Sequence, residues 1–88
     1  MYFVYLIENE QKKKYIGYTN DIKRRLKDHN THQNKSTSNG IWKLIYCEVY
    51  VHKMDAIGRE KFLKGGSGWR YIRKQLKFYF EEQKKLLS

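Results

Sequence analysis

The sequence predicts an α+β domain whose elements follow the order β-β-α-β-α-α. Three observations support this prediction. The chain opens on aromatic and branched residues, a polar stretch separates them from a second short run of the same kind, and later segments repeat apolar residues at helical spacing. With 88 residues the chain has room for one hydrophobic core, so we expect a single domain over residues 1–88.

The first two predicted strands form a β-hairpin. Residues 2–7 carry apolar side chains at both parities, which is typical of a central strand buried on two faces. Residues 13–19 form the second strand, and the polar stretch between the two runs predicts the turn. A turn centred on Glu10 places Tyr5 directly opposite Tyr15, so we expect the two phenols to share one face of the sheet.

The remaining elements follow from caps, periodicity and glycine. Asn20 and Asp21 are typical helix starts, and Ile22, Leu26 and His29 repeat at the spacing of one helical face. This helix should end near Asn30, and a polar loop should follow over 31–40. We then expect a strand over 42–51 and a helix over 53–64. A glycine-rich break over 65–68 separates these from a last helix over 69–87.

Charge and cysteine content restrict the class of partner. Lys and Arg number 19 against nine Asp and Glu, and the resulting net charge of +10 favours association with polyanions, nucleic acid first among them. The single cysteine, Cys47, excludes an intramolecular disulfide and a multi-thiolate zinc site, so we expect a reducing, cytoplasmic setting. The apolar run at the N-terminus is too short to span a membrane, and we expect no membrane partner.

Two charged residues lie at the border of, or within, the apolar face of a predicted helix. Arg25 borders the apolar stripe that contains Ile22, and its stem could simply cover that surface while its head reaches water. Glu60 projects within the arc defined by Ala56 and Leu63, where a buried carboxylate is costly unless it is paired or bound to a metal. An ion pair with Arg25 or with a lysine is the structural alternative.

These residues also fall into a recognisable set of motifs. The set comprises Val4-Tyr5, Tyr15-Ile16-Gly17, the helical run from Asp21 to Asn30, and Glu60 in the second helix. In this combination and spacing the chain resembles the GIY-YIG nuclease family from about Tyr2 to Lys77, and in particular its small stand-alone bacterial members. The first motif departs from the family pattern, because Phe3-Val4-Tyr5 keeps the tyrosine but lacks the glycine and the isoleucine.

The resemblance implies a fold and a chemistry. The fold is a three-stranded antiparallel sheet flanked by helices, and the chemistry is hydrolysis of a DNA phosphodiester bond with one divalent metal, Mg²⁺ or Mn²⁺. Carried over position by position, the catalytic residues are Tyr5, Tyr15, Arg25, His29 and Glu60, with Glu60 as the metal ligand. A single carboxylate completed by water suits Mg²⁺. We favour Tyr15 as the general base, and Tyr5 is the alternative.

Basic residues outside the motifs predict how DNA is held. The candidates for phosphate contact are Lys23, Arg24, Lys27, Lys35, Arg70, Arg73 and Lys74. We expect no appended DNA-binding domain and therefore low sequence specificity, with branched or single-stranded DNA or a protein partner supplying selectivity. A non-catalytic nucleic-acid-binding module is the alternative function, and attachment to an anionic membrane surface through the last helix is a weaker one.

Overall fold

The computed structural model describes residues 1–31 and 40–87, which contain three strands and four helices. In chain order these are β1 (Tyr2–Asn9), β2 (Lys14–Thr19), α1 (Ile22–Asn30), β3 (Trp42–Tyr50), α2 (Lys53–Lys64), α3 (Gly66–Gln75) and α4 (Lys77–Leu87). The α+β fold class is confirmed. The bounds of the first five elements agree with the predicted ones to within two residues.

The strands form one antiparallel sheet in the order β2-β1-β3. The first strand is central, as predicted from its apolar residues at both parities. Val4 and Leu6 pack with the buried Ala56, Leu63 and Ile72 on one side of the sheet, whereas Tyr5 and Ile7 pack with Trp42 on the other. Because β1 lies between the other two strands, β2 and β3 are both edge strands, each with one side that pairs with no strand among the described residues.

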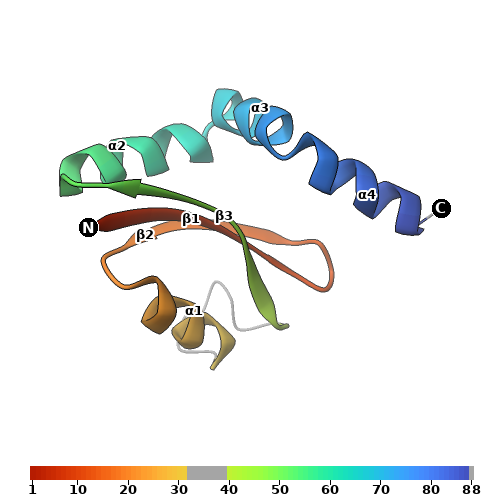
Figure 1. Cartoon of the computed structure of the whole chain (residues 1–88), viewed down its shortest axis with the longest axis horizontal. Coiled ribbons are helices and arrows are strands. Elements are labelled where there is room, and N and C mark those ends of the chain that lie inside the picture. The colour runs from red at the N-terminus through yellow and green to blue at the C-terminus, as the bar shows by residue number, and fades with distance from the viewer. Residues whose placement is uncertain (32–39, 88) are drawn as a thin grey trace.

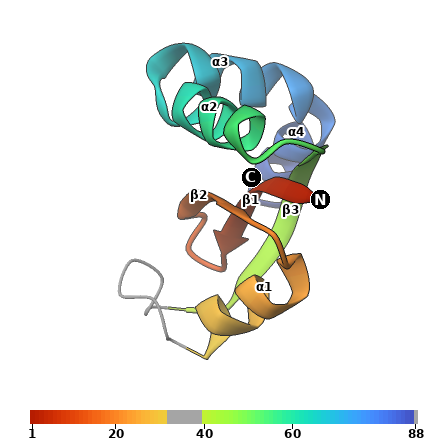
Figure 2. The ribbon, with the colours of Figure 1, turned by 90° about the vertical axis from the view of Figure 1, so that its left-hand side faces the viewer.

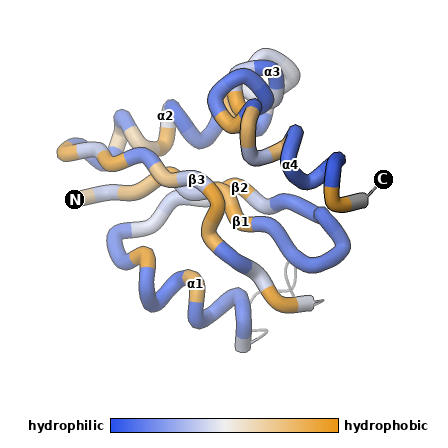
Figure 3. Tube along the Cα trace, turned by 45° about the vertical axis from the view of Figure 1, so that its right-hand side comes forward, coloured by the Kyte–Doolittle hydropathy of each residue, from blue (hydrophilic) through white to orange (hydrophobic). Residues whose placement is uncertain are grey.

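Helices cover both faces of the sheet. Figures 1 and 2 show α1 on one side and α2, α3 and α4 on the opposite side. Each helix contributes few apolar residues, and Figure 3 shows the α1 trace as largely hydrophilic with isolated hydrophobic positions. Those of α1 are Ile22 and Leu26, which pack against the cluster of Tyr5 and Ile7.

The register of the hairpin differs from the predicted one. Tyr5 pairs with Gly17, and Tyr15 pairs with Ile7, so the prediction that the two tyrosines lie directly opposite each other is wrong. The turn is longer than expected, because the Asn9 side-chain oxygen accepts from the backbone N–H groups of Gln11 and Lys13, each at 3.0 Å. The tyrosines are diagonal neighbours on one face, with ring centroids 6.3 Å apart.

The C-terminal region also differs from the prediction of one long helix after a glycine-rich break. Gly66 and Gly68 lie inside α3, and the chain bends at Leu76 before α4 begins. A Cβ on Gly68 would lie 2.1 Å from the Phe62 carbonyl oxygen, so this glycine permits close approach of α3 to the end of α2. Gly68 therefore serves helix packing.

The bend at Leu76 lets α4 reach the far end of the central strand. Glu8 of β1 is fully buried and accepts hydrogen bonds of 2.6 Å from the Tyr79 hydroxyl and from the Gln83 amide, both on α4. Its other oxygen lies 3.0 Å from the ammonium of Lys14. Burial alone raises the pKa of Glu8, but these bonds outweigh it and hold the pKa below its usual range. A charged Glu8 thus attaches α4 to the sheet.

Candidate active site

The position of the Tyr5 side chain depends on the glycine opposite it. Tyr5 lies on β1 and its cross-strand partner on β2 is Gly17. A Cβ added at Gly17 would lie 2.6 Å from the Tyr5 hydroxyl and 3.1 Å from the ring of Tyr15. Because glycine has no Cβ, the Tyr5 phenol lies across the edge strand and beside Tyr15.

A hydrogen-bond chain joins Arg25, Tyr5 and His29. The Arg25 Nε donates to the Tyr5 hydroxyl at 3.2 Å, and that hydroxyl lies 2.8 Å from the His29 Nε2. An arginine can only donate, so we assign the hydroxyl proton to the bond with a neutral His29 that accepts at Nε2. Burial, followed by the charge of Arg25, holds the pKa of His29 below its usual value, which favours the neutral imidazole.

Helix α1 brings Arg25 and His29 to this chain. The Asp21 side chain caps the helix by accepting a 3.1 Å hydrogen bond from a backbone N–H in the first turn. Ile22 and Leu26 hold the helix against the sheet. Arg25 and His29 are four residues apart and therefore lie one above the other on the same side of the helix.

Burial separates the members of this cluster into two kinds. Tyr5 is 2% exposed and His29 is fully buried, whereas Tyr15 and Arg25 are partly exposed. Burial, as the largest effect, raises the pKa of Tyr5 to about 12, against the lowering effect of Arg25. The hydrogen bond to Tyr5 raises the pKa of Arg25, and Tyr15 adds to that shift. The two partly exposed members are therefore a guanidinium that stays charged, from Arg25, and a phenol, from Tyr15.

Glu60 approaches the cluster from the helix layer opposite α1. It lies on α2 between the buried Ala56 and Leu63, and its side chain is 17% exposed. Its charge is the smallest of the effects that shift the pKa of Tyr5, and that effect is upward. The ion pair that the sequence left open exists with Lys64 at 3.5 Å, but that lysine is 53% exposed and such a pair contributes only about 0.3–0.5 kcal/mol.

A second carboxylate fixes the helix that carries Glu60. Glu48 of β3 accepts from the neighbouring Arg59 at 2.8 Å and 3.0 Å, and also from the hydroxyls of Tyr46 and Tyr50. Burial raises the pKa of Glu48, yet the Arg59 and tyrosine hydrogen bonds prevail and the net shift is downward. This fully bonded pair is structural, whereas Glu60 on α2 makes only the 3.5 Å pair with Lys64 among the described residues.

Comparison with known proteins identifies the family. A profile of the GIY-YIG catalytic domain matches residues 1–81. The chain belongs to the GIY-YIG family. A nuclease-type function follows, with a nucleic acid as the substrate class. No helix within residues 1–31 and 40–87 is long and apolar enough to cross a membrane.

The relatives of this GIY-YIG chain are UPF0213 proteins. One from Clostridium perfringens is 32% identical over 66 residues, which cover 73% of this chain and 71% of the relative. YazA of Bacillus subtilis is 28% identical over 85 residues, covering 94% of this chain and 81% of the relative. The solution NMR structure of a UPF0213 protein from Bacillus halodurans shares 26% identity and covers 100% of this chain and 86% of that one, with a TM-score of 0.40.

The donor set of this GIY-YIG site fits a divalent metal held by one carboxylate. Among the described residues, no group of three or more His, Cys, Asp or Glu side chains comes together. Glu60 is a partly exposed carboxylate with only a long pair to Lys64. Mg²⁺ keeps several waters and commonly takes one or two protein carboxylates. The residues present therefore fit Mg²⁺ or Mn²⁺ at Glu60.

The structure separates the predicted DNA contacts into two groups. Lys23, Arg24 and Lys27 are exposed on α1, on one side of the sheet, whereas Arg70, Arg73 and Lys74 are exposed on α3, on the other side. Lys35 lies outside the described residues.

Sequence reasoning did not identify Lys64 and Lys14 as lining residues of one hollow. Lys64 contacts Glu60 directly, and Lys14 and Lys64 line one hollow beside the edge strand β2, together with Trp69. Lys64 is four residues after Glu60 on a predicted helix, a spacing that could have identified it. Lys14 and Trp69 are far apart in sequence, and only the fold brings them together.

Proposed function

We propose that this GIY-YIG protein hydrolyses phosphodiester bonds in DNA with one divalent metal at Glu60. The observation that carries the proposal is that the buried Tyr5 contacts the Tyr15 phenol and the Arg25 guanidinium and responds to the charge of the Glu60 carboxylate. All three are partly exposed. Phosphoryl transfer to water needs a proton acceptor, a cation for the phosphate and a metal ligand, and these side chains supply that set.

Arg25 is the group that we propose to contact the scissile phosphate. Arg25 donates from Nε to the Tyr5 hydroxyl and also interacts with Tyr15, and its terminal nitrogens would donate to phosphate oxygens as negative charge builds on them. Tyr5 and His29 are too buried to contact DNA directly. In this proposal they are positioning residues that fix the guanidinium.

Tyr15 is the general base in our proposal. Its ring packs 4.8 Å from that of His29, and its side chain is partly exposed beside Arg25. Tyr5 serves this role poorly, because it is buried and its hydroxyl is already bonded to Arg25 and His29. The structure thus supports the first of the two assignments that the sequence left open.

Glu60 would hold Mg²⁺ or Mn²⁺. When bound, the ion supplies positive charge for the transition state of phosphate hydrolysis. Glu60 suits this role because Arg59 fixes the helix beside it through Glu48, so the carboxylate is held in place before any ligand arrives.

DNA is held mainly through its phosphates in this proposal. The net charge of +10 and the exposed lysines and arginines of α1 and α3 support sequence-independent contact. A cytoplasmic setting, and a protein partner that adds specificity, belong to the same proposal.

The test is a cleavage assay on single-stranded, duplex, flapped and branched DNA and RNA, with Mg²⁺ or with a chelator. We expect cleavage in Mg²⁺ alone, loss of cleavage in Arg25→Ala with the fold intact, and binding that weakens steeply with salt. Salt-sensitive binding without cleavage of any substrate would instead favour the non-catalytic binding module. The exposed Lys61→Ala, on the catalytic helix α2, is the charge-matched control.

A further inference from the structure

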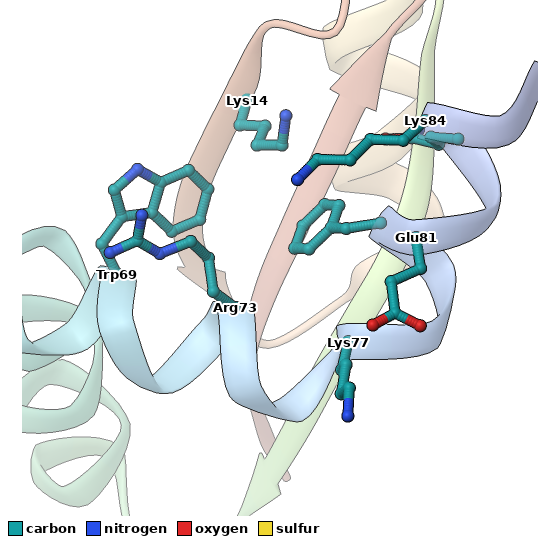
Figure 4. A pocket seen from close by; sticks show the side chains of 8 residues that line it. Lys14, Trp69, Arg73, Lys77, Glu81 and Lys84 are labelled. Carbon is teal, nitrogen blue, oxygen red and sulfur yellow. The ribbon is translucent and has the colours of Figure 1, made fainter. Parts of the chain in front are cut away.

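A pocket lies beyond the catalytic cluster, where α3 and α4 face the edge strand β2. It has a volume of about 420 Å³, and its walls include Lys14, Trp69, Arg73, Phe80 and Lys84 (Figure 4). This volume is within the range of small-molecule sites. None of the motif residues lines it.

The charge of this pocket favours an anion. Lys14, Arg73, Lys77 and Lys84 contribute four cations, and Glu81 contributes one carboxylate. Lys14 is the partner of the buried Glu8, at 3.0 Å, whereas the other three cations are exposed. Exposed cations around a concavity attract phosphate groups.

Two aromatic rings form the apolar part of the pocket. Trp69 of α3 and Phe80 of α4 are both partly exposed, and the Lys14 ammonium lies 6.0 Å and 5.4 Å from their respective ring centroids. Nucleobases stack on such rings, and stacking combined with lysines and arginines is the usual way to hold unpaired nucleotides.

The pocket wall is fixed before a ligand binds. The buried Glu8 holds Tyr79 and Gln83 of α4 at 2.6 Å and Lys14 of β2 at 3.0 Å. These bonds set the separation between the Phe80 ring and the edge strand. A preformed site loses less entropy when it binds.

A second hollow connects the pocket to the catalytic carboxylate. It is lined by Lys14, Ile16, Leu63, Lys64 and Trp69, so it shares Lys14 and Trp69 with the first pocket. At its other end Lys64 pairs with Glu60 at 3.5 Å. Through Lys64, the two hollows extend along β2 toward Glu60, the carboxylate proposed to hold the metal.

We propose that this pocket binds an unpaired nucleotide of the DNA strand that is cleaved, with the base on Trp69 and Phe80 and the phosphate on Arg73 and Lys84. The proposal rests on the function proposed above and specifies its substrate class. A base within a duplex is already stacked and paired, so the pocket selects DNA that is single-stranded beside the cleaved bond.

The test measures binding of labelled oligonucleotides without metal, so that cleavage does not interfere. We expect a 12-nucleotide thymidine strand to bind more tightly than a hairpin duplex of equal charge. Phe80→Leu should weaken binding of the strand about tenfold while changing duplex binding little. Phe78→Leu is the matched control, since this neighbouring ring is 80% exposed and does not line the pocket.

Equal affinity for strand and duplex, or equal affinity of the Phe80→Leu and Phe78→Leu variants for the strand, would overturn the proposal. If Phe80→Leu unfolds, the exposed Arg73→Ala is compared with Lys61→Ala instead, and the same loss is expected. The catalytic variant Arg25→Ala should keep the preference for the strand. A protein that cleaves but shows no preference refutes the pocket alone, whereas preference without cleavage refutes the proposed function alone.

Discussion

The Tyr5 hydroxyl lies 2.6 Å from the point that a Cβ on Gly17 would occupy. Gly17→Ala must therefore displace the buried phenol and break its bonds to Arg25 and His29. We expect the cleavage rate to fall about 100-fold, because a displacement of about 1 Å at a catalytic group has this effect. Cleavage rates and thermal melts of the Gly17→Ala variant test this expectation. Gly58→Ala is the control, since no described atom lies within 4 Å of its added Cβ.

Glu60→Gln separates the metal role from a structural one. We expect Mg²⁺-dependent cleavage to disappear, while the free energy of unfolding without metal changes by no more than about 0.5 kcal/mol, the usual contribution of an exposed pair such as that with Lys64. By contrast, Glu48→Gln should lower the free energy of unfolding by about 2 kcal/mol, because the hydrogen bonds between Glu48 and Arg59 are charge-assisted. Marked destabilisation by Glu60→Gln would make Glu60 a structural residue.

Tyr15→Phe tests the assignment of the general base. The loss of one hydroxyl should reduce the cleavage rate about 100-fold or more, with DNA affinity unchanged within about twofold, since the proton is taken only in the transition state. Tyr18→Phe is the matched control on the same strand, because its side chain faces the other side of the sheet. Single-turnover rates and binding curves measure both effects. Wild-type cleavage by Tyr15→Phe would exclude this role.

Alkaline pH should destabilise the protein through Tyr5. Its pKa is raised to about 12 when folded, above the ordinary value, so between these values the unfolded chain loses the proton while the folded chain keeps it. The free energy of unfolding therefore falls as pH rises through this window, by up to about 2.7 kcal/mol for this group. Tyr5→Phe should reduce the slope of the profile from pH 10 to 12 in urea titrations, and the raised pKa values of Tyr46 and Tyr50 account for the slope that remains. An unchanged slope would contradict the shift.

Helix caps and apolar periodicity predict most of this fold. Asp21 begins α1 as expected, and β1 is central because its apolar residues occupy both parities. The hairpin register was not predictable, since it depends on two hydrogen bonds to Asn9 and on a positive φ of 66° at Lys12. The bend at Leu76 has no glycine or proline to mark it and follows from the distant contact of α4 with Glu8.

The candidate site was predictable where motifs identify it. The motif predicted that Tyr5, Tyr15, Arg25 and His29 belong together, and the structure brings them together. Their division into buried and exposed members could not be predicted, because burial depends on packing between layers. The pocket of Trp69 and Phe80 could not be predicted either, since its walls combine Lys14 of β2 with residues of α3 and α4 that are distant from it in sequence.

The central strand β1 should tolerate substitutions less well than the exposed positions of α4. Within four positions, β1 supplies Tyr5 to the catalytic cluster and Glu8 to the attachment of α4. A substitution in this strand disturbs both at once. The exposed outer positions of α4, by contrast, touch neither, so directed evolution toward a new DNA structure should accumulate changes on that helix and leave β1 almost untouched.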